Sequence, residues 1–214
     1  MGVKSVLFLL LLVVATSYAQ TKCCFPNQFE ISMGQDSGLS QAGKASAVFS
    51  NAYVAFDYTN KRTGVLANMT QDGQFIFLQE ILDYNKGVQY IIQPMTQTCQ
   101  KIPLSGPMDH CVPANATYFN TIYLGNKKLT IDNFLLSVPG AQATFAVTKG
   151  DCIPSSQLAF GESGGVSFLT VVGYYNYVSG IKNPSTYFTV PSYCPKSASN
   201  EPKMYDMRRF KLFA

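Results

Sequence analysis

The chain contains six cysteines, and they restrict its possible folds more than any other feature of the sequence. An even number of cysteines in an oxidising compartment indicates disulfides, here three. Cys23 and Cys24 are adjacent and point in different directions, so they should attach the N-terminal segment at two separate places. A zinc site is the competing interpretation, but the chain has no Cys-x-x-Cys spacing and a single histidine. The six are Cys23, Cys24, Cys99, Cys111, Cys152 and Cys194.

The N-terminus has the pattern of a secretory signal peptide. Lys4 gives a short positive start, residues 5–14 are almost all apolar, and Ser17 and Ala19 occupy the positions that signal peptidase requires. The apolar run is too short to cross roughly 30 Å of hydrocarbon, for which a helix needs ~20 residues. We therefore expect residues 1–19 to be removed and the protein to be secreted and extracellular, with no transmembrane segment.

Removal of 19 of the 214 residues leaves 195, and the loss of Lys4 lowers the formal charge from +4 to +3. This length predicts one β domain, residues 20–196, followed by a tail, residues 197–214. The charge is too weak and too scattered for binding to nucleic acid. The tail mixes basic and apolar residues, which fits either a membrane-surface helix or a solvated chain end.

From residue 45 onward, segments rich in Val, Ile, Phe and Tyr alternate with turns. Asn85-Lys86-Gly87 is a strong hairpin signal, because Asn and Gly tolerate left-handed turn positions. Helical periodicity is scarce, so we expect an all-β fold with minor helix, built as one antiparallel sheet system. The expected strands span residues 47–58, 65–68, 75–84, 88–93, 99–104, 118–124, 129–138, 142–149, 157–160, 166–177 and 187–190.

Several of these strands carry large apolar side chains on both faces. Because side chains alternate along a strand, Phe168 and Val172 should lie on one face, and Leu169 and Val171 on the other. One face could be core and the other a ligand cavity, a surface under a helix or a subunit interface. A sheet that is simply buried on both sides explains the pattern equally well.

Two sequons predict N-linked glycosylation in the secretory pathway, at Asn68 and Asn115. A third, at Asn183, is excluded by the proline that follows it. Both predicted sites must lie on the surface if they carry glycans.

One motif suggests catalysis, but its context does not support it. Residues 161–165 have the Gly-x-Ser-x-Gly pattern around Ser163. A nucleophilic serine of this kind needs a following helix and a histidine base. The sequence after Ser163 is β-branched, and His110 lies between prolines, where a solvated loop is expected. We therefore interpret the motif as a hairpin turn and the protein as a non-enzyme.

A series of short motifs surrounds the cysteines. They are residues 23–30 (CCFPNQFE), 55–62 (AFDYTNKR), 82–84 (LDY), 87–90 (GVQY), 99–101 (CQK), 149–154 (KGDCIP) and 180–185 (GIKNPS), with Cys194 closing the series. The order of these motifs resembles that of the ependymin family, in particular its invertebrate ependymin-related members. The likeness extends over residues 23–195. Phe29 and Phe56 replace the Trp and Tyr usual in the family, and Ile31 replaces a frequent Gly.

The resemblance implies two stacked antiparallel sheets that form a half-barrel with an apolar pocket, similar to bacterial lipoprotein carriers. It also implies a homodimer and bound calcium in many members, and disulfides Cys23–Cys152 and Cys99–Cys194, which leave Cys24 to pair with Cys111. An exchange of partners between the adjacent Cys23 and Cys24 is the alternative. The sequence has no EF-hand spacing, and each aspartate by itself is more often a turn or surface residue. The aspartates that could include calcium ligands are Asp36, Asp57, Asp83, Asp109, Asp132 and Asp151.

The apolar strands and the resemblance together predict a secreted glycoprotein that binds a hydrophobic, lipid-like ligand. The alternative is a calcium-associated glycoprotein of the extracellular matrix, or of a mineralised or mucous secretion, without a small-molecule ligand. The predicted pocket is lined by Phe77, Leu78, Leu82, Tyr84, Tyr90, Phe168, Val172 and Tyr174.

Overall fold

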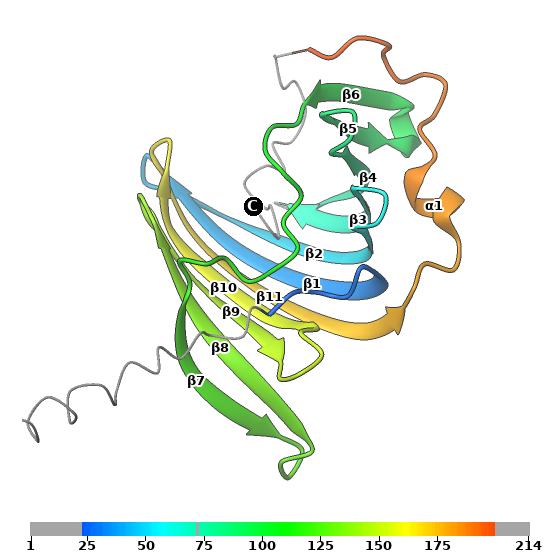
Figure 1. Ribbon diagram of the computed structural model, residues 1–214. Coiled ribbons are helices and arrows are strands. Elements are labelled where there is room, and N and C mark those ends of the chain that lie inside the picture. Colours follow the sequence, from blue (N-terminus) through cyan, green and yellow to red (C-terminus); the bar gives the residue numbers. More distant parts are fainter. Residues whose placement is uncertain (1–22, 72, 200–214) are drawn as a thin grey trace, which may run out of the picture.

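The computed structural model describes residues 23–71 and 73–199 of the chain. The predicted signal peptide and most of the predicted tail lie outside these residues. Within them the chain forms eleven strands, a 3-10 helix and one short α-helix (Figure 1). The elements are β1 (Gln28–Gln41), β2 (Lys44–Asp57), β3 (Arg62–Gln71), β4 (Gln74–Asp83), β5 (Val88–Gln93), η1 (Pro94–Thr96), β6 (Thr98–Pro103), β7 (Thr117–Leu124), β8 (Leu129–Val138), β9 (Ala141–Thr148), β10 (Pro154–Ser163), β11 (Val166–Ser179) and α1 (Pro184–Phe188).

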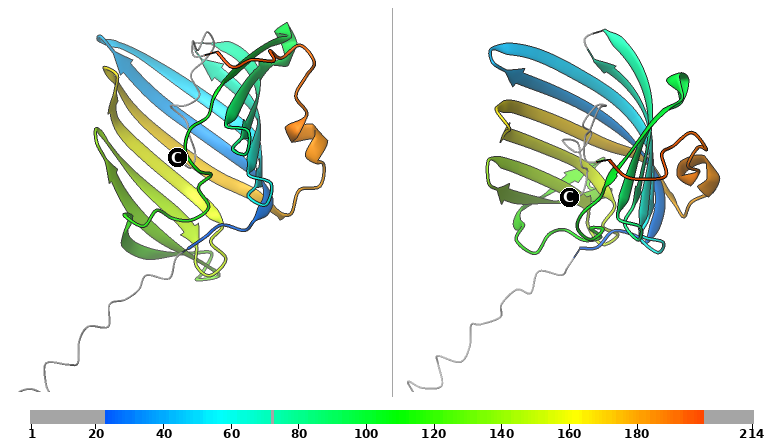
Figure 2. Two further views of the ribbon diagram at one scale, coloured as in Figure 1. Left: turned by 45° about the horizontal axis from the view of Figure 1, so that its top comes forward. Right: turned by 90° about the horizontal axis from the view of Figure 1, so that it is seen from above.

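All eleven strands belong to one antiparallel sheet, in the order β6-β5-β4-β3-β2-β1-β11-β10-β9-β8-β7. Each half is a series of hairpins between consecutive strands, and the pairing of β1 with β11 joins the two halves. The sheet curves strongly, which gives it a concave and a convex face (Figures 1 and 2). The all-β prediction is confirmed. The expectation of two stacked sheets is corrected, because the hydrogen-bonded ladder continues without a break through β1 and β11.

The main core covers the concave face, and strict alternation along the strands builds it. On β1 and β2 the cross-strand pair Phe29 and Phe56 is buried on this face, and the two rings stack with their centroids 5.0 Å apart. The same alternation continues through β3, β4 and β11. The most buried apolar members of this cluster are Phe29, Val48, Ala52, Phe56, Leu78 and Val147.

Two strand predictions are corrected by the structure. β1 was not expected, because its second half buries the polar residues Gln35 and Ser37 where an amphipathic strand would have apolar ones. These two side chains satisfy each other by a hydrogen bond, and Ser37 also bonds to Thr170 of β11. The strand expected at residues 187–190 is absent, since Tyr187 lies within α1.

The short helix α1 covers one end of the convex face, over β2, β3 and β4 (Figure 1). It fits there because Gly64 has no side chain: a Cβ at this position would lie 2.7 Å from Cβ of Tyr187. The side-chain amide of Gln79 donates to the backbone oxygens of Thr186 and Tyr187. A second, smaller cluster forms beside the helix from Ile81, Tyr90, Ile92 and Phe188.

The turn between β2 and β3 is organised by the buried carboxylate of Asp57, which is 1% exposed. It accepts hydrogen bonds from the side chains of Gln28, Asn60 and Arg62 at 2.8 Å each, and from the backbone N–H of Asn60. Burial alone would raise the pKa of Asp57, but the bonds from Asn60, Gln28 and Arg62 outweigh it and hold the pKa below its ordinary value.

We predict that Gly64→Ala destabilises the protein by about 1–3 kcal/mol, because the added methyl group overlaps the backbone and Cβ of Tyr187. Gly38→Ala is the matched control: it lies in a strand of the same sheet, with no atom within 4 Å of the added Cβ. It should change stability by less than about 0.5 kcal/mol. Thermal unfolding followed by circular dichroism compares the two variants, and equal melting temperatures would contradict the packing argument.

We predict that Asp57→Ala lowers the free energy of unfolding by about 2–4 kcal/mol, because it removes a buried acceptor of several hydrogen bonds. The stabilisation by Asp57 should be complete above the ordinary carboxyl pKa of about 4 and should be lost as the pH falls through its lower folded-state pKa. The control is Asp83→Ala, which removes the exposed ion pair with Lys86 and should cost under about 1 kcal/mol. Urea titrations at pH 7 and pH 3 measure the free energy of unfolding of the wild type and of both variants. If Asp57→Ala lowered this free energy equally at the two pH values, the charged state assigned to Asp57 would be contradicted.

Candidate functional site

The concave face is the candidate site, and it brings together most of the predicted pocket residues. Leu78 and Val172 are buried there in the main cluster, and Tyr174 packs against this cluster. Leu82 and Phe168 lie on the same face, four residues from Leu78 on β4 and from Val172 on β11. Burial raises the pKa of the Tyr174 phenol well above its ordinary value.

Two predicted pocket residues lie on the opposite face. Phe77 alternates with Leu78 along β4, so both cannot line one surface. Tyr90 packs on the convex side with Ile81 and Phe188, and the Nζ of Lys101 lies 5.6 Å from its ring centroid. The prediction that Phe77 and Tyr90 line the pocket is therefore wrong, because it did not separate the two faces of these strands.

One end of the concave face is polar, a feature that the sequence prediction missed except for Tyr84. The side-chain amide of Gln89 donates to the carboxylate of Glu80 on the neighbouring strand. The nearby Tyr84 has its pKa raised to about 12 by burial and by the negative charges of Asp109 and Glu80. The sequence feature that could have indicated this polar end is Gln89, which interrupts the otherwise apolar strand Val88–Gln93.

Two glutamine carbonyl oxygens at this end are buried without a donor. Oε1 of Gln89 and Oε1 of Gln100 accept no hydrogen bond from any residue that the structure describes. Both side chains project from the concave face of β5 and β6, where Gln89 lies opposite Ile102 and Gln100 lies opposite Ile91, so that the two glutamines are diagonal neighbours. Buried polar atoms are nearly always satisfied in folded proteins, so two such acceptors in one place require an explanation.

A segment outside the named strands, residues 104–116, runs along the concave side between β6 and β7 (Figures 1 and 2). We call it the closing segment. Its residues Met108, Val112 and Ala116 belong to the main apolar cluster. Backbone hydrogen bonds attach it to the N-terminal segment, from Phe25 N to His110 O at 2.7 Å and from Val112 N to Cys23 O at 2.8 Å.

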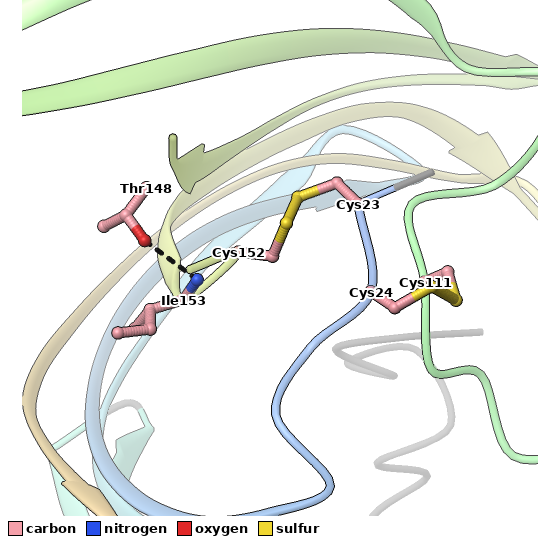
Figure 3. The surroundings of a disulfide bond; sticks show 6 residues. All are labelled: Cys23, Cys24, Cys111, Thr148, Cys152 and Ile153. Carbon is pink, nitrogen blue, oxygen red and sulfur yellow. Dashed lines mark hydrogen bonds between the residues drawn. A yellow bond between two sulfur atoms is a disulfide. The ribbon is translucent and has the colours of Figure 1, made fainter. Parts of the chain in front are cut away.

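Three disulfides fix these segments to the sheet. Cys24–Cys111 joins the N-terminal segment to the closing segment, and Cys23–Cys152 joins it to the turn before β10 (Figure 3). Cys99–Cys194 ties the segment after α1 to β6. These are the three pairs that the resemblance implies. All six cysteines are used, and none is free for metal binding.

His110 is not the solvated loop residue that was expected. Its ring stacks on Tyr58 with the centroids 3.8 Å apart, and Lys61 Nζ lies 3.0 Å from the centroid of the Tyr58 ring. Burial and the charge of Lys61 lower the pKa of His110. No local pattern indicated this contact, because it joins the β2–β3 turn to a segment that is remote in the sequence.

The geometry around the Gly-x-Ser-x-Gly motif is that of a hairpin. Ser163 pairs with Val166, and the two residues between them, Gly164 and Gly165, have φ of +58° and +74°. Such left-handed positions favour glycine and form the tight turns of hairpins. A strand, β11, follows in place of the helix that a nucleophilic serine requires.

Calcium has no assigned site among the described residues. The one close group of three potential side-chain ligands there is Cys24, His110 and Cys111, and its two cysteines are consumed by a disulfide. Asp57 is saturated by hydrogen-bond donors, and Asp83 is paired with Lys86. No three carboxylates among the described residues lie close enough together to form such a group, and calcium binding stays a prediction.

Both predicted glycosylation sites are exposed. Asn68 lies in the middle of β3, and Asn115 lies at the end of the closing segment. Glycosylation of either residue stays a prediction. Neither helix among the described residues has the length and apolar character needed to span a bilayer.

The fold and the site together define a class of protein: a single curved antiparallel sheet, cross-linked by three disulfides, with a largely apolar concave face. The sequence model of the ependymin family matches residues 72–194. The chain belongs to the ependymin family. This membership and the disulfides indicate an extracellular protein.

Two relatives support this placement, and a solved structure has a similar fold. The development-specific protein LVN1.2 of the sea urchin Lytechinus variegatus is 31% identical over 165 residues, which cover 69% of this chain and 87% of that protein. Ependymin-related protein 2 of the abalone Haliotis asinina is 28% identical over 155 residues, 66% of this chain and 76% of that protein. The crystal structure of an uncharacterized conserved protein from Thermus thermophilus has a TM-score of 0.52 at 10% identity, covering 78% of this chain and 86% of that one. At that identity it shows similarity of fold alone.

We predict that Cys24→Ser/Cys111→Ser loosens the closing segment, because the disulfide is its covalent link to the N-terminal segment. The amides of Phe25 and Val112 should exchange with solvent on the order of tenfold faster or more, since their hydrogen bonds then open locally. Hydrogen exchange read by mass spectrometry measures this. In the control Cys99→Ser/Cys194→Ser, at the other side of the sheet, these two amides should stay protected. Equal exchange in the two variants would contradict the assigned role.

Proposed function

We propose that this protein is a secreted carrier of an apolar, lipid-like molecule, which it holds against the concave face of the sheet. The observation that carries the proposal is the pair of buried carbonyl oxygens, of Gln89 and Gln100, that lack a donor among the described residues. Leaving each of them unsatisfied costs about 1–3 kcal/mol. A bound molecule that supplies donors removes this cost.

The surroundings of these two oxygens fit the chemistry of a lipid. Ile91 lies opposite Gln100 and two residues along β5 from Gln89, and the apolar wall continues through Leu82 and Leu78 on β4. Ligand pockets are mostly apolar, with a few polar groups that fix orientation. The wall supports binding of a hydrocarbon chain, and the polar end supports binding of a head group.

The polar end offers mainly acceptors. They are the carboxylate of Glu80 and the carbonyl oxygens of Gln89 and Gln100, and the amide of Gln89 is already engaged by Glu80. A head group with N–H or O–H donors, such as an amine or an alcohol, complements them. A carboxylate head group has only hydrogen-bond acceptors, which cannot pair with the acceptors of the site, so it should bind less well.

We predict that the protein binds dodecylamine and dodecanol more tightly than dodecanoate, three probes with the same chain and different heads. Gln89→Met/Gln100→Met removes the carbonyl oxygens at nearly constant volume and should weaken dodecanol binding about tenfold. Isothermal titration calorimetry measures the affinities. The control is Gln142→Met, the same change at an exposed residue of β9.

Organic extraction of the purified secreted protein, followed by mass spectrometry, tests for a natural ligand. The carrier proposal expects a stoichiometric apolar molecule with a donor head group. If no molecule is extracted and none of the three probes binds, the proposal fails. Calcium-dependent retention of the protein in matrix would then favour the extracellular matrix function.

A further inference from the structure

The convex face is covered by α1 at one end and carries exposed aromatic rings beyond it. Phe49 on β2, Tyr53 on β2 and Phe75 on β4 are 55%, 58% and 71% exposed. Large exposed aromatic side chains on one continuous surface are uncommon in proteins that stay soluble and monomeric, and they mark a surface that binds something.

These rings are grouped around one residue, Asn68. In the register of the sheet, Asn68 of β3 lies opposite Asn51 on β2 and opposite Phe77 on β4. Thr70, two residues further along the same face, lies opposite both Phe49 and Phe75. Residues directly opposite have Cβ atoms about 5 Å apart and diagonal neighbours about 7–8 Å, so all these rings are within reach of a group attached to Asn68.

Asn68 and Thr70 are the two essential residues of a predicted glycosylation sequon. Asn68 is exposed in the folded protein and its side chain projects from the convex face. Gly64, the contact point of α1, lies on the same face four residues earlier, roughly 13 Å away at about 3.3 Å per residue. A glycan on Asn68 would therefore begin close to where the cover provided by α1 ends.

We propose that Asn68 carries an N-linked glycan whose innermost sugar stacks on this aromatic surface and covers it. A pyranose ring has a face of C–H groups that packs against an aromatic ring, while its hydroxyl groups remain in water. The rings of Phe49, Phe75 and Phe77 provide such surfaces on both sides of the attachment point. Burying them reduces the exposed apolar area, which is worth about 25 cal/mol for each Å².

The covalent attachment selects the glycan over other occupants of this face. A sugar linked to Asn68 acts at a high effective concentration, because its linkage holds it beside the rings. It also prevents the close approach of a second sheet, whose face would have to pack about 10 Å away. This inference does not depend on any ligand of the concave face.

The test uses protein secreted from eukaryotic cells that make endoglycosidase H-sensitive glycans. Glycopeptide mapping should find Asn68 occupied. Asn68→Gln should lower the melting temperature by about 2–4 °C. Trimming by endoglycosidase H leaves a single sugar on Asn68. The trimmed protein should keep the higher melting temperature of the fully glycosylated protein. The matched control is Asn115→Gln, which removes the other predicted glycan from the segment before β7, outside the strands β2 and β4 that carry Phe49, Phe75 and Phe77.

A double-mutant cycle distinguishes stacking from a general effect of glycosylation. In a protein that already carries Phe49→Ala and Phe75→Ala, Asn68→Gln should lower the melting temperature by less than about 1 °C. The change in melting temperature caused by Asn115→Gln should be the same as in the wild-type background. Both phenylalanines are exposed, so the background should fold. An unoccupied Asn68, an equal shift in both backgrounds, or a glycosylated dimer cross-linked through this face would each overturn the proposal.

Discussion

The pairing of β1 with β11 is the interaction on which the rest of the structure depends. Each half of the sheet is a set of hairpins that its own turns can form locally. β1 and β11 are the central strands and are separated by most of the chain, from Phe29 paired with Ser179 to Gln41 paired with Val166. Contacts between such distant residues form at a high entropic cost, so the sheet becomes one cooperative unit only when this pair is made. The disulfide between Cys23 and Cys152 links the same two halves and lowers that cost.

Joining the halves in this way gives the sheet two different faces, and each is covered by segments outside the ladder. The concave face is covered by the closing segment, and one end of the convex face by α1. Both covers are short and neither is paired into the sheet, so their own packing offsets little of the entropy lost on ordering them. Each is also tied down by a disulfide, Cys24–Cys111 for the closing segment and Cys99–Cys194 beside α1. Each disulfide therefore anchors at least one segment that lies outside the sheet.

Local sequence patterns were sufficient to predict most strands and the class of fold. Hairpin signals such as Asn85-Lys86-Gly87 act over a few residues, and the structure has a hairpin there. β1 was missed because burial of Gln35 and Ser37 is made possible by a hydrogen bond to Thr170, which is remote in sequence. The order of the strands within the single sheet could not be predicted for the same reason, since it depends on which strands lie next to each other at the centre. The resemblance, and not the spacing, supplied the disulfide pairs.

In the candidate site, too, local sequence patterns predicted the features that depend on neighbouring residues and missed those that depend on segments remote in the sequence. Alternation along β11 correctly separated Phe168 and Val172 from Leu169 and Val171, because the period of two is fixed by the backbone. Which of the two faces is concave depends on the curvature of the whole sheet, and so Phe77 and Tyr90 were assigned to the wrong side. The stacking of His110 on Tyr58 arises only when the closing segment crosses the sheet. The polar end is also formed by neighbouring strands. Glu80, Gln89 and Gln100 belong to no recognisable sequence motif. The register of β4, β5 and β6 places them together and so concentrates hydrogen-bond acceptors within an apolar wall. If the carrier proposal holds, a face of this composition would select a ligand by its head group, whereas its apolar part would accept many hydrocarbon chains, because apolar contact is not directional.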